Sequence, residues 1–159
     1  MVMHEIRRQD VDTMARTIYG EARGEDLQGM RAVGHVIWNR ARNPGWWSRI
    51  WLSDLNEGWD ASLADIPDDS IEAVCRKPWQ FSPWNHGNPN RAKVEDVSLD
   101  NKRFRDAFYA TLAVIQGRAG DPTDGSTHFY APGVMDPPTW IENATLHASI
   151  GGHKFYTLD

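Results

Sequence analysis

One carboxylate in this sequence, Glu21, has a position that suits acid chemistry. Glu21 follows Ile18 by three residues and Met14 by seven, so on a helix it points with the apolar stripe. A carboxyl group aimed at a core is costly unless it pairs with a cation or stays protonated with a raised pKa. A raised pKa is what a general acid needs near neutral pH. The pattern leaves two interpretations open: Glu21 is a general acid, or it pairs with an arginine such as Arg23 or Arg31.

A second carboxylate, Glu25, would follow one turn later if the helix continued through Gly24. The spacing gives only Glu21 a persuasive position. We therefore expect Glu25 to support the site, either by orienting it or by pairing with an arginine.

The segment 79–90 combines aromatic residues with turn formers, which is typical of an ordered loop. Trp79 and Trp84 flank the polar residues Gln80 and Ser82, so we expect both indoles to line a groove. Gln80 and Ser82 either hydrogen-bond the substrate or satisfy the backbone of their own loop. Phe81 lies between Gln80 and Ser82 and completes the motif Trp79–Ser82.

The turn formers Asp124 and Gly125 predict a short hairpin that leads into a strand at 127–130. His128 and Tyr130 would share one face of this strand, and Phe129 would take the other. If Phe129 is the core residue, His128 and Tyr130 point into the cleft; the alternative buries Tyr130 with its hydroxyl bonded to the main chain. Thr123, in the preceding turn, is expected to be structural, with a supporting role in the cleft left open.

We expect no metal and no other cofactor. None of the six histidines forms a His-Glu-x-x-His motif or an i, i+4 pair on a helix. His35 falls on the polar side of its helix, where we expect it to be solvated. Cys75 is the only cysteine, so no disulfide can form within this sequence, and no activating partner is visible beside it.

The remaining pattern predicts one mainly helical domain over residues 1–159 with a small β-hairpin. Helical stripes and capping residues indicate a helix capped by Asp10, a helix over 27–41, a short helix capped by Ser70 and a helix over 100–116 capped by Asp100. The tail after Gly152 is predicted to supply another short strand.

Composition narrows the classes of partner. The chain of 159 residues is 40% hydrophobic and 25% charged, with a net charge of −5, which argues against nucleic-acid binding by bulk electrostatics. No segment approaches the roughly 18 apolar residues of a membrane span, and the first residues lack the apolar stretch of a signal peptide. We expect a monomer that is made in the cytoplasm.

Several motifs together resemble the SleB-like cell-wall hydrolase family, which is typified by a spore-cortex-lytic enzyme. The resemblance covers about residues 11–156, and its motifs are Ile18–Glu25, Gly29–Arg40, Trp79–Ser82, Asp121–Tyr130 and Gly152–Tyr156. It implies a lysozyme-like fold that acts on peptidoglycan glycan strands, with Glu21 as the catalytic acid. The resemblance also favours substrate contacts for Gln80 and Phe81. It implies no role for the residues that follow Ser82 in that loop.

The resemblance further implies lytic transglycosylase chemistry, in which one carboxyl group serves as acid and then as base. Glu21 would cleave the bond between N-acetylmuramic acid and N-acetylglucosamine and leave a 1,6-anhydro end. The alternatives are a hydrolysing muramidase and a noncatalytic peptidoglycan-binding module. We expect action at the cell wall or in the periplasm, reached through an export signal outside this sequence or, as for a phage endolysin, through holin lesions.

Overall fold

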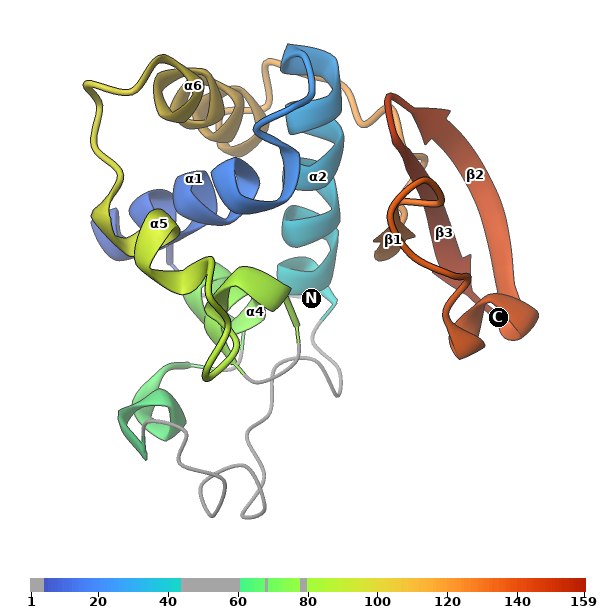
Figure 1. Ribbon diagram of the computed structural model, residues 1–159, viewed down its shortest axis with the longest axis horizontal. Helices are drawn as coiled ribbons and strands as arrows, with labels where there is room; N and C mark the ends of the chain where they lie inside the picture. The colour runs from blue at the N-terminus through green and yellow to red at the C-terminus, as the bar shows by residue number, and fades with distance from the viewer. Residues whose placement is uncertain (1–4, 44–60, 68, 78–79) are drawn as a thin grey trace.

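The computed structural model describes residues 5–43, 61–67, 69–77 and 80–159. Within them a body of helices lies beside a three-stranded sheet (Figure 1). The longer helices are α1 (Arg8–Ala22), α2 (Leu27–Arg42) and α6 (Lys102–Ile115), and the shorter ones are α4 (Ile71–Arg76), α5 (Arg91–Asp96) and the 3₁₀ turns η2 (Ala61–Asp65), η3 (Ser82–Trp84) and η4 (Thr139–Asn143). The strands are β1 (His128–Tyr130), β2 (Ala144–Ile150) and β3 (His153–Leu158). No helix among the described residues is long and apolar enough to cross a membrane.

The core lies where α1, α2 and α6 pack on one another. The apolar stripe predicted for the second helix is confirmed: Met30, Val33, Gly34, Ile37 and Ala41 are all buried. The helices approach closely at the glycine of this stripe, because a Cβ there would lie 3.2 Å from both the Ile18 Cδ1 and the Val114 Cγ2 atoms. Burial of these stripes stabilises the body that carries Glu21.

Two predicted N-caps are wrong, the first by three residues and the second by one. Asp10 is the third residue of α1 rather than its N-cap, and its carboxylate accepts a hydrogen bond from the Arg7 backbone N–H at 2.9 Å. Asn101 caps α6 in place of Asp100, since its side chain accepts from the Arg103 backbone N–H at 2.9 Å. An acidic side chain can serve either at the cap or in the first turn, and the local sequence does not decide between these places. Ser70 caps α4 as predicted.

The sheet has the antiparallel order β1-β3-β2. Asp124 and Gly125 do form a turn, with φ values of 52° and 80°, but the hairpin predicted there is wrong. The segment before this turn is held by Asp121, whose carboxylate accepts from the Asn39 amide at 3.0 Å, so β1 pairs with β3 instead. The hairpin is formed by β2 and β3 and turns at Gly151 (φ 56°).

Side-chain packing and hydrogen bonds attach the sheet to the helical body. Phe155 of β3 is fully buried and belongs to the same core as α1 and α2. At the C-terminal end of α2, the Asn39 amide donates to the Ser126 carbonyl at 3.0 Å and the Arg40 Nε donates to the Thr127 carbonyl at 2.6 Å. These contacts fix the start of β1 against α2.

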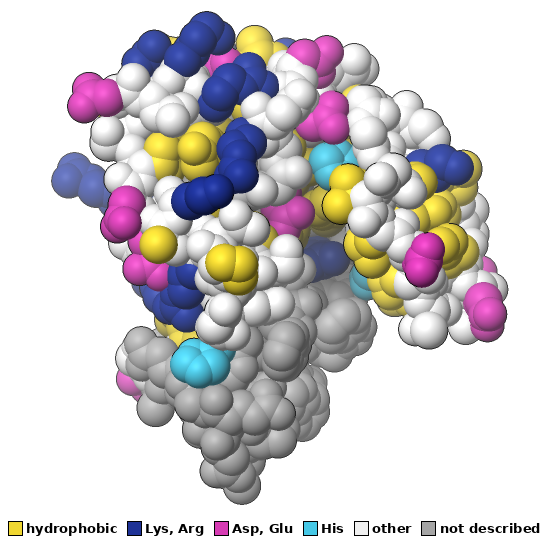
Figure 2. All heavy atoms as spheres, viewed as in Figure 1, with side chains coloured by type: hydrophobic (Ala, Val, Ile, Leu, Met, Phe, Trp, Pro, Cys, Tyr) yellow, Lys and Arg dark blue, Asp and Glu magenta, His cyan; other side chains and the backbone are white. Residues whose placement is uncertain are grey.

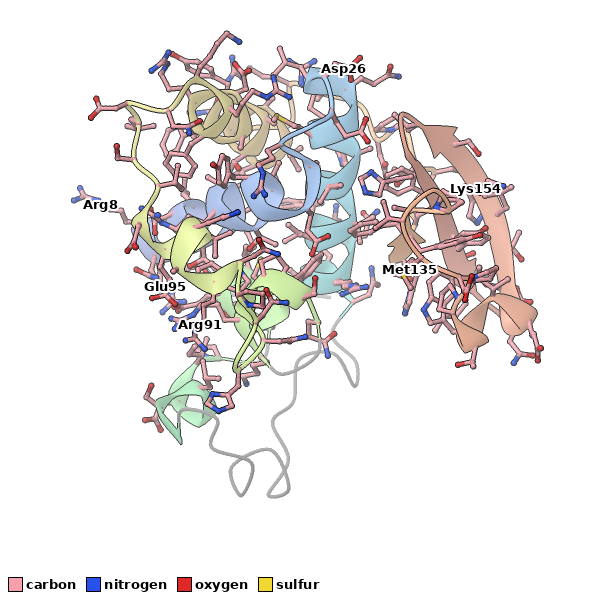
Figure 3. The ribbon with its side chains drawn as sticks, viewed as in Figure 1. Arg8, Asp26, Arg91, Glu95, Met135 and Lys154 are labelled. Atoms are coloured by element: carbon pink, nitrogen blue, oxygen red, sulfur yellow. The ribbon has the colours of Figure 1, made fainter. Side chains whose placement is uncertain are left out.

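The outer faces of the helices carry ion pairs that have little bearing on the site. Asp12 and Arg16, spaced i, i+4 on α1, pair at 2.9 Å. Arg91 and Glu95 pair at 2.6 Å on α5, and Figure 3 shows both side chains along with Asp26 at the start of α2. Exposed pairs of this kind contribute roughly 0–1 kcal/mol to stability.

Candidate active site

A cleft of about 660 Å³ lies between the helical body and the sheet. Figure 2 shows a hollow there, in which acidic, basic and histidine side chains reach the surface. Three parts of the chain line the cleft. The helical side contributes Glu21, Ala22, Gly24, Glu25 and Arg40, and the segment around η3 contributes Gln80, Phe81, Ser82 and Asn85. The sheet side contributes Phe129, Tyr130, Ala131, Gly133, Val134, Met135, Gly152 and His153. The cleft therefore brings together residues more than 130 positions apart.

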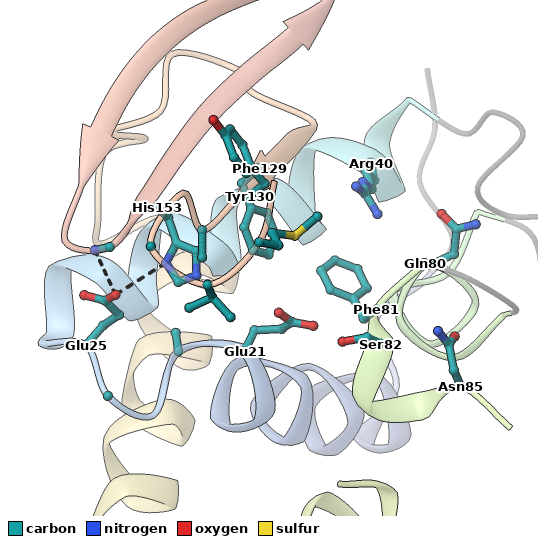
Figure 4. A pocket seen from close by; sticks show the side chains of 17 residues that line it. Glu21, Glu25, Arg40, Gln80, Phe81, Ser82, Asn85, Phe129, Tyr130 and His153 are labelled. Carbon is teal, nitrogen blue, oxygen red and sulfur yellow. Dashed lines mark hydrogen bonds and ion pairs between the residues drawn. The ribbon is translucent and has the colours of Figure 1, made fainter. Parts of the chain in front are cut away.

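Glu21 lies in the last turn of α1 and is half-buried in the cleft (Figure 4). Burial raises the pKa of its carboxyl group to about 7, although the positive charge of Arg40 and a hydrogen bond from the Ser82 backbone both lower it. The cation that acts on Glu21 is thus Arg40, and not the predicted Arg23 or Arg31. A carboxyl group with this pKa, open to a cleft, is suited to donate a proton near neutral pH.

Arg40 is a site residue that the sequence analysis missed. It is buried, and its guanidinium lies 4.9 Å from the centre of the Phe81 ring. Burial lowers the pKa of Arg40 to about 10, and the charge of Glu21 opposes this shift. A signal was present, because Arg40 follows Ile37 by three residues and so falls on the apolar stripe of α2, as Glu21 does on α1.

Three of the residues predicted in the aromatic loop line the cleft and one does not. Gln80, Phe81 and Ser82 line it, with Phe81 only 2% exposed and its ring 6.2 Å from that of Phe129. Trp84 is buried in the core, where its Nε1–H donates to the Thr17 Oγ1 at 2.8 Å. The groove prediction for Trp84 is therefore wrong.

The reason is that η3 turns the chain inward directly after Ser82, so Trp84 packs under α1 rather than beside the cleft. Trp79 lies outside the described residues.

On the sheet side, Tyr130 lines the cleft but His128 does not. His128 is buried on the face that Trp140 covers, with the two rings 5.1 Å apart, so the prediction that it points into the cleft is wrong. Burial and the charge of Arg40 lower its pKa to about 4. Phe129 packs against Phe155 and also lines the cleft, so the core and the cleft share this face of β1.

Glu25 and His153 meet at one end of the cleft. Because α1 ends at Ala22, Glu25 lies on the connection to α2 and not one helical turn beyond Glu21. Its carboxylate accepts a hydrogen bond from the Gly152 backbone N–H at 3.0 Å and lies 3.5 Å from the His153 Nδ1 (Figure 4). Pairing with an arginine, one of the two roles left open for this side chain, is absent from the described contacts; Arg103 instead donates to the Glu25 backbone carbonyl.

Thr123 is fully buried and does not line the cleft. Its hydroxyl donates to the Asp121 carboxylate at 2.6 Å, and the same carboxylate accepts from Asn39. Thr123 therefore supports the turn that leads into β1, which agrees with the structural role expected for it.

The prediction that His35 is solvated is wrong. Its side chain is buried, and its Nε2 lies 3.1 Å from the Ala119 carbonyl oxygen. The chain after α6 covers this side of α2, which the helical pattern could not reveal. In the part of the chain that the structure describes, no group of three or more histidine, cysteine or acidic side chains is arranged to hold a metal ion.

Comparison with known proteins gives consistent matches. The model of the family described as cell wall hydrolase matches residues 61–156. A spore cortex-lytic enzyme of Halalkalibacterium halodurans is 27% identical over 146 residues, covering 92% of this chain and 34% of that protein. The spore cortex-lytic enzyme of Bacillus subtilis is 25% identical, with 92% and 37% covered. The chain spans about a third of the length of these curated relatives.

Two solved structures share the fold. The catalytic domain of the Bacillus cereus SleB protein matches with a TM-score of 0.66 and 25% identity, covering 98% of this chain and 95% of that one. The catalytic domain of a germination-specific lytic transglycosylase, SleB from Bacillus anthracis, matches with a TM-score of 0.62 and 24% identity, covering 98% and 100%. These matches confirm the lysozyme-like, mainly helical fold and the family resemblance. The chain belongs to the cell wall hydrolase family.

Proposed function

We propose that this protein is a lytic transglycosylase that cleaves peptidoglycan between N-acetylmuramic acid and N-acetylglucosamine, with Glu21 as its single general acid and base. The observation that carries the proposal is the Glu21 carboxyl group, half-buried in the cleft with a pKa of about 7. The similarity to the catalytic domains of SleB proteins, one of them described as a lytic transglycosylase, supports the same chemistry.

In the first step, protonated Glu21 donates its proton to the glycosidic oxygen, and the bond from that oxygen to C1 of the muramoyl sugar breaks. The carboxylate that remains is stabilised by the nearby charge of Arg40 and by the Ser82 backbone hydrogen bond. In the second step, the carboxylate takes the proton from the 6-hydroxyl of the same sugar, whose oxygen bonds to C1. Glu21 is protonated again, and the product carries a 1,6-anhydro end.

The arrangement of acidic groups favours this single-carboxylate route over two-carboxylate hydrolysis. Among the described residues that line the cleft, only Glu21 and Glu25 are acidic. Glu25 accepts a hydrogen bond from the Gly152 N–H and lies against His153, which favours a supporting role over that of a nucleophile or a base for water. A hydrolysing muramidase that uses Glu21 and one water is the alternative enzyme, and a noncatalytic peptidoglycan-binding module is the alternative outside enzymes.

Digestion of purified sacculi in water enriched in heavy oxygen tests all three alternatives. We expect soluble products with anhydro ends and no heavy oxygen at the cleaved C1. Incorporation of heavy oxygen there would show hydrolysis, and intact sacculi would indicate a binding module. Glu21→Gln should lower the rate by on the order of 10²–10⁴, since the amide keeps the shape of the side chain but loses its proton. Glu95→Gln, on the outer face of α5, is the matched control and should keep full activity.

The remaining contacts with substrate are also proposals. Gln80, Ser82 and Tyr130 line the cleft with polar groups that suit sugar hydroxyls and acetamido groups. Action at the cell wall agrees with the family, while release through holin lesions and a monomeric state remain predictions. Light scattering of the purified protein would determine the oligomeric state.

A further inference from the structure

His153, the first residue of β3, is only 7% exposed yet lines the cleft. Its ring packs perpendicular to that of Phe129, with the centres 5.2 Å apart. Its Nδ1 is buried and makes no hydrogen bond within the described part of the chain; the Glu25 carboxylate lies 3.5 Å away. Figure 4 shows the imidazole ring between Glu25 and Glu21.

Glu25 is held firmly in this position. Its Oε1 accepts from the Gly152 N–H at 3.0 Å, and its carboxylate fills the space above the β2–β3 turn. A Cβ at Gly151 would collide with the Glu25 Oε2, and one at Gly152 would lie 3.1 Å from Oε1. The two glycines therefore leave the room that this carboxylate fills beside His153.

This arrangement selects one form of the imidazole. If Nδ1 carried a lone pair, that lone pair would face a carboxylate, and the two would repel each other. If Nδ1 carries the proton, its N–H faces the same carboxylate and is attracted to it. The partner of one ring nitrogen fixes the proton on it and leaves the other nitrogen as an acceptor. The Nε2 of neutral His153 is then a hydrogen-bond acceptor.

We propose that Glu25 holds His153 as its Nδ1–H tautomer, so that Nε2 accepts a hydrogen bond from a hydroxyl or acetamido N–H of the glycan in the cleft. His153 is then a substrate-binding residue, and Glu25 is a positioning residue that acts through it. This inference rests on the proposed function, because that function supplies the sugar as the ligand. It also gives Glu25 a role distinct from that of a second catalytic carboxylate.

The proposal has a consequence for the pH dependence of activity. Burial lowers the pKa of His153, and the charge of Glu25 opposes this shift. Among the described residues, the other charged side chains that line the cleft with this ring are Glu21 and Arg40, and Lys154 is the next residue of β3. Protonation at low pH would turn Nε2 into a donor, so kcat/KM should fall on the acidic side. Glu25→Gln removes a charge that favours protonation, so this acidic limb should move to lower pH.

Nitrogen NMR on the Glu21→Gln variant, with histidine labelled at both ring nitrogens, tests the tautomer directly. In the free protein at a pH of about 7.5, above the ordinary pKa of histidine, we expect His153 as the Nδ1–H form. Titration with peptide-free glycan strands should shift the Nε2 signal of His153 and leave that of His147, on β2 outside the cleft, unchanged. An Nε2–H tautomer, or saturation by the strands without a change at His153, would overturn the proposal.

Enzyme kinetics on Glu25→Gln supply the second test. We expect kcat/KM to fall about 3- to 10-fold at neutral pH, as for the loss of one positioned hydrogen bond, with the acidic limb displaced to lower pH. A purely structural Glu25 would lower kcat/KM by the same factor at every pH and leave the limb in place, which would contradict the proposal. Failure of the proposed function is distinguishable, because the wild-type protein would then leave sacculi intact while the tautomer could still be measured.

Discussion

Replacing Glu21 by glutamine should change how the stability of this protein depends on pH. The Glu21 carboxyl group has a pKa of about 7 in the folded protein against an ordinary value of 4.5, and burial is the main cause. Between these two values the folded state binds more protons than the unfolded state, so the free energy of unfolding falls as the pH rises. The loss begins near pH 4.5 and is complete above about pH 7. The amide of the Glu21→Gln variant cannot ionise, so this contribution vanishes.

The size of the effect follows from the shift. Moving the pKa from 4.5 to about 7 corresponds to at most about 3.4 kcal/mol of folding free energy lost on ionisation. Glu21 retains partial contact with solvent through the cleft, which weakens the effect, so we expect about 1–2 kcal/mol. For a chain of 159 residues this is a change of roughly 2–8 °C in Tm.

Urea unfolding of both proteins at about pH 5 and about pH 8.5 measures this difference. The free energy of unfolding of Glu21→Gln relative to wild type should be about 1–2 kcal/mol higher at the alkaline pH than at the acidic one. Other titrating groups are shared by the two proteins and cancel in the comparison, and Glu95→Gln should show no such trend. Equal differences at the two pH values would refute the raised pKa, and with it the argument that Glu21 is protonated near neutral pH.

Three further predictions concern the loop that lines the cleft, Trp84 in the core, and the independence of activity from metal ions. Gln80→Ala should lower kcat/KM several-fold with little change in Tm. Phe81→Ala should instead lower the free energy of unfolding by about 3–5 kcal/mol, because its ring is buried. Thermal unfolding and enzyme kinetics, measured on both variants, make the comparison. If Gln80→Ala unfolds the protein and its folded fraction keeps full activity, the loop is only scaffold. Trp84→Phe should lower the free energy of unfolding by about 1–2 kcal/mol, because the hydrogen bond to Thr17 is lost, and should leave kcat/KM of the folded protein unchanged. A large loss of activity would indicate instead that Trp84 contacts the substrate. Exhaustive chelation should leave activity and Tm unchanged, and loss of activity with rescue by zinc would contradict this.

Local periodicity was sufficient to predict the helical body and the direction of Glu21. The stripe through Met30 and Ile37, and the placement of Glu21 in phase with Ile18, depend only on residues within a few turns of one another. The same local logic failed where two neighbouring side chains could each cap a helix, as Asp100 and Asn101 could. Choices between adjacent residues depend on backbone angles that the sequence pattern does not specify.

The sequence by itself therefore determined the mainly helical fold and an acid placed against an apolar face. Only the tertiary structure decided what surrounds that acid: Arg40 beside Glu21, Trp84 packed beneath α1, and the β2–β3 turn that brings His153 onto Glu25. These contacts join residues between 19 and 128 positions apart. Local periodicity carries no information about such pairs, because they form only when separate elements pack together and close the long segments between them.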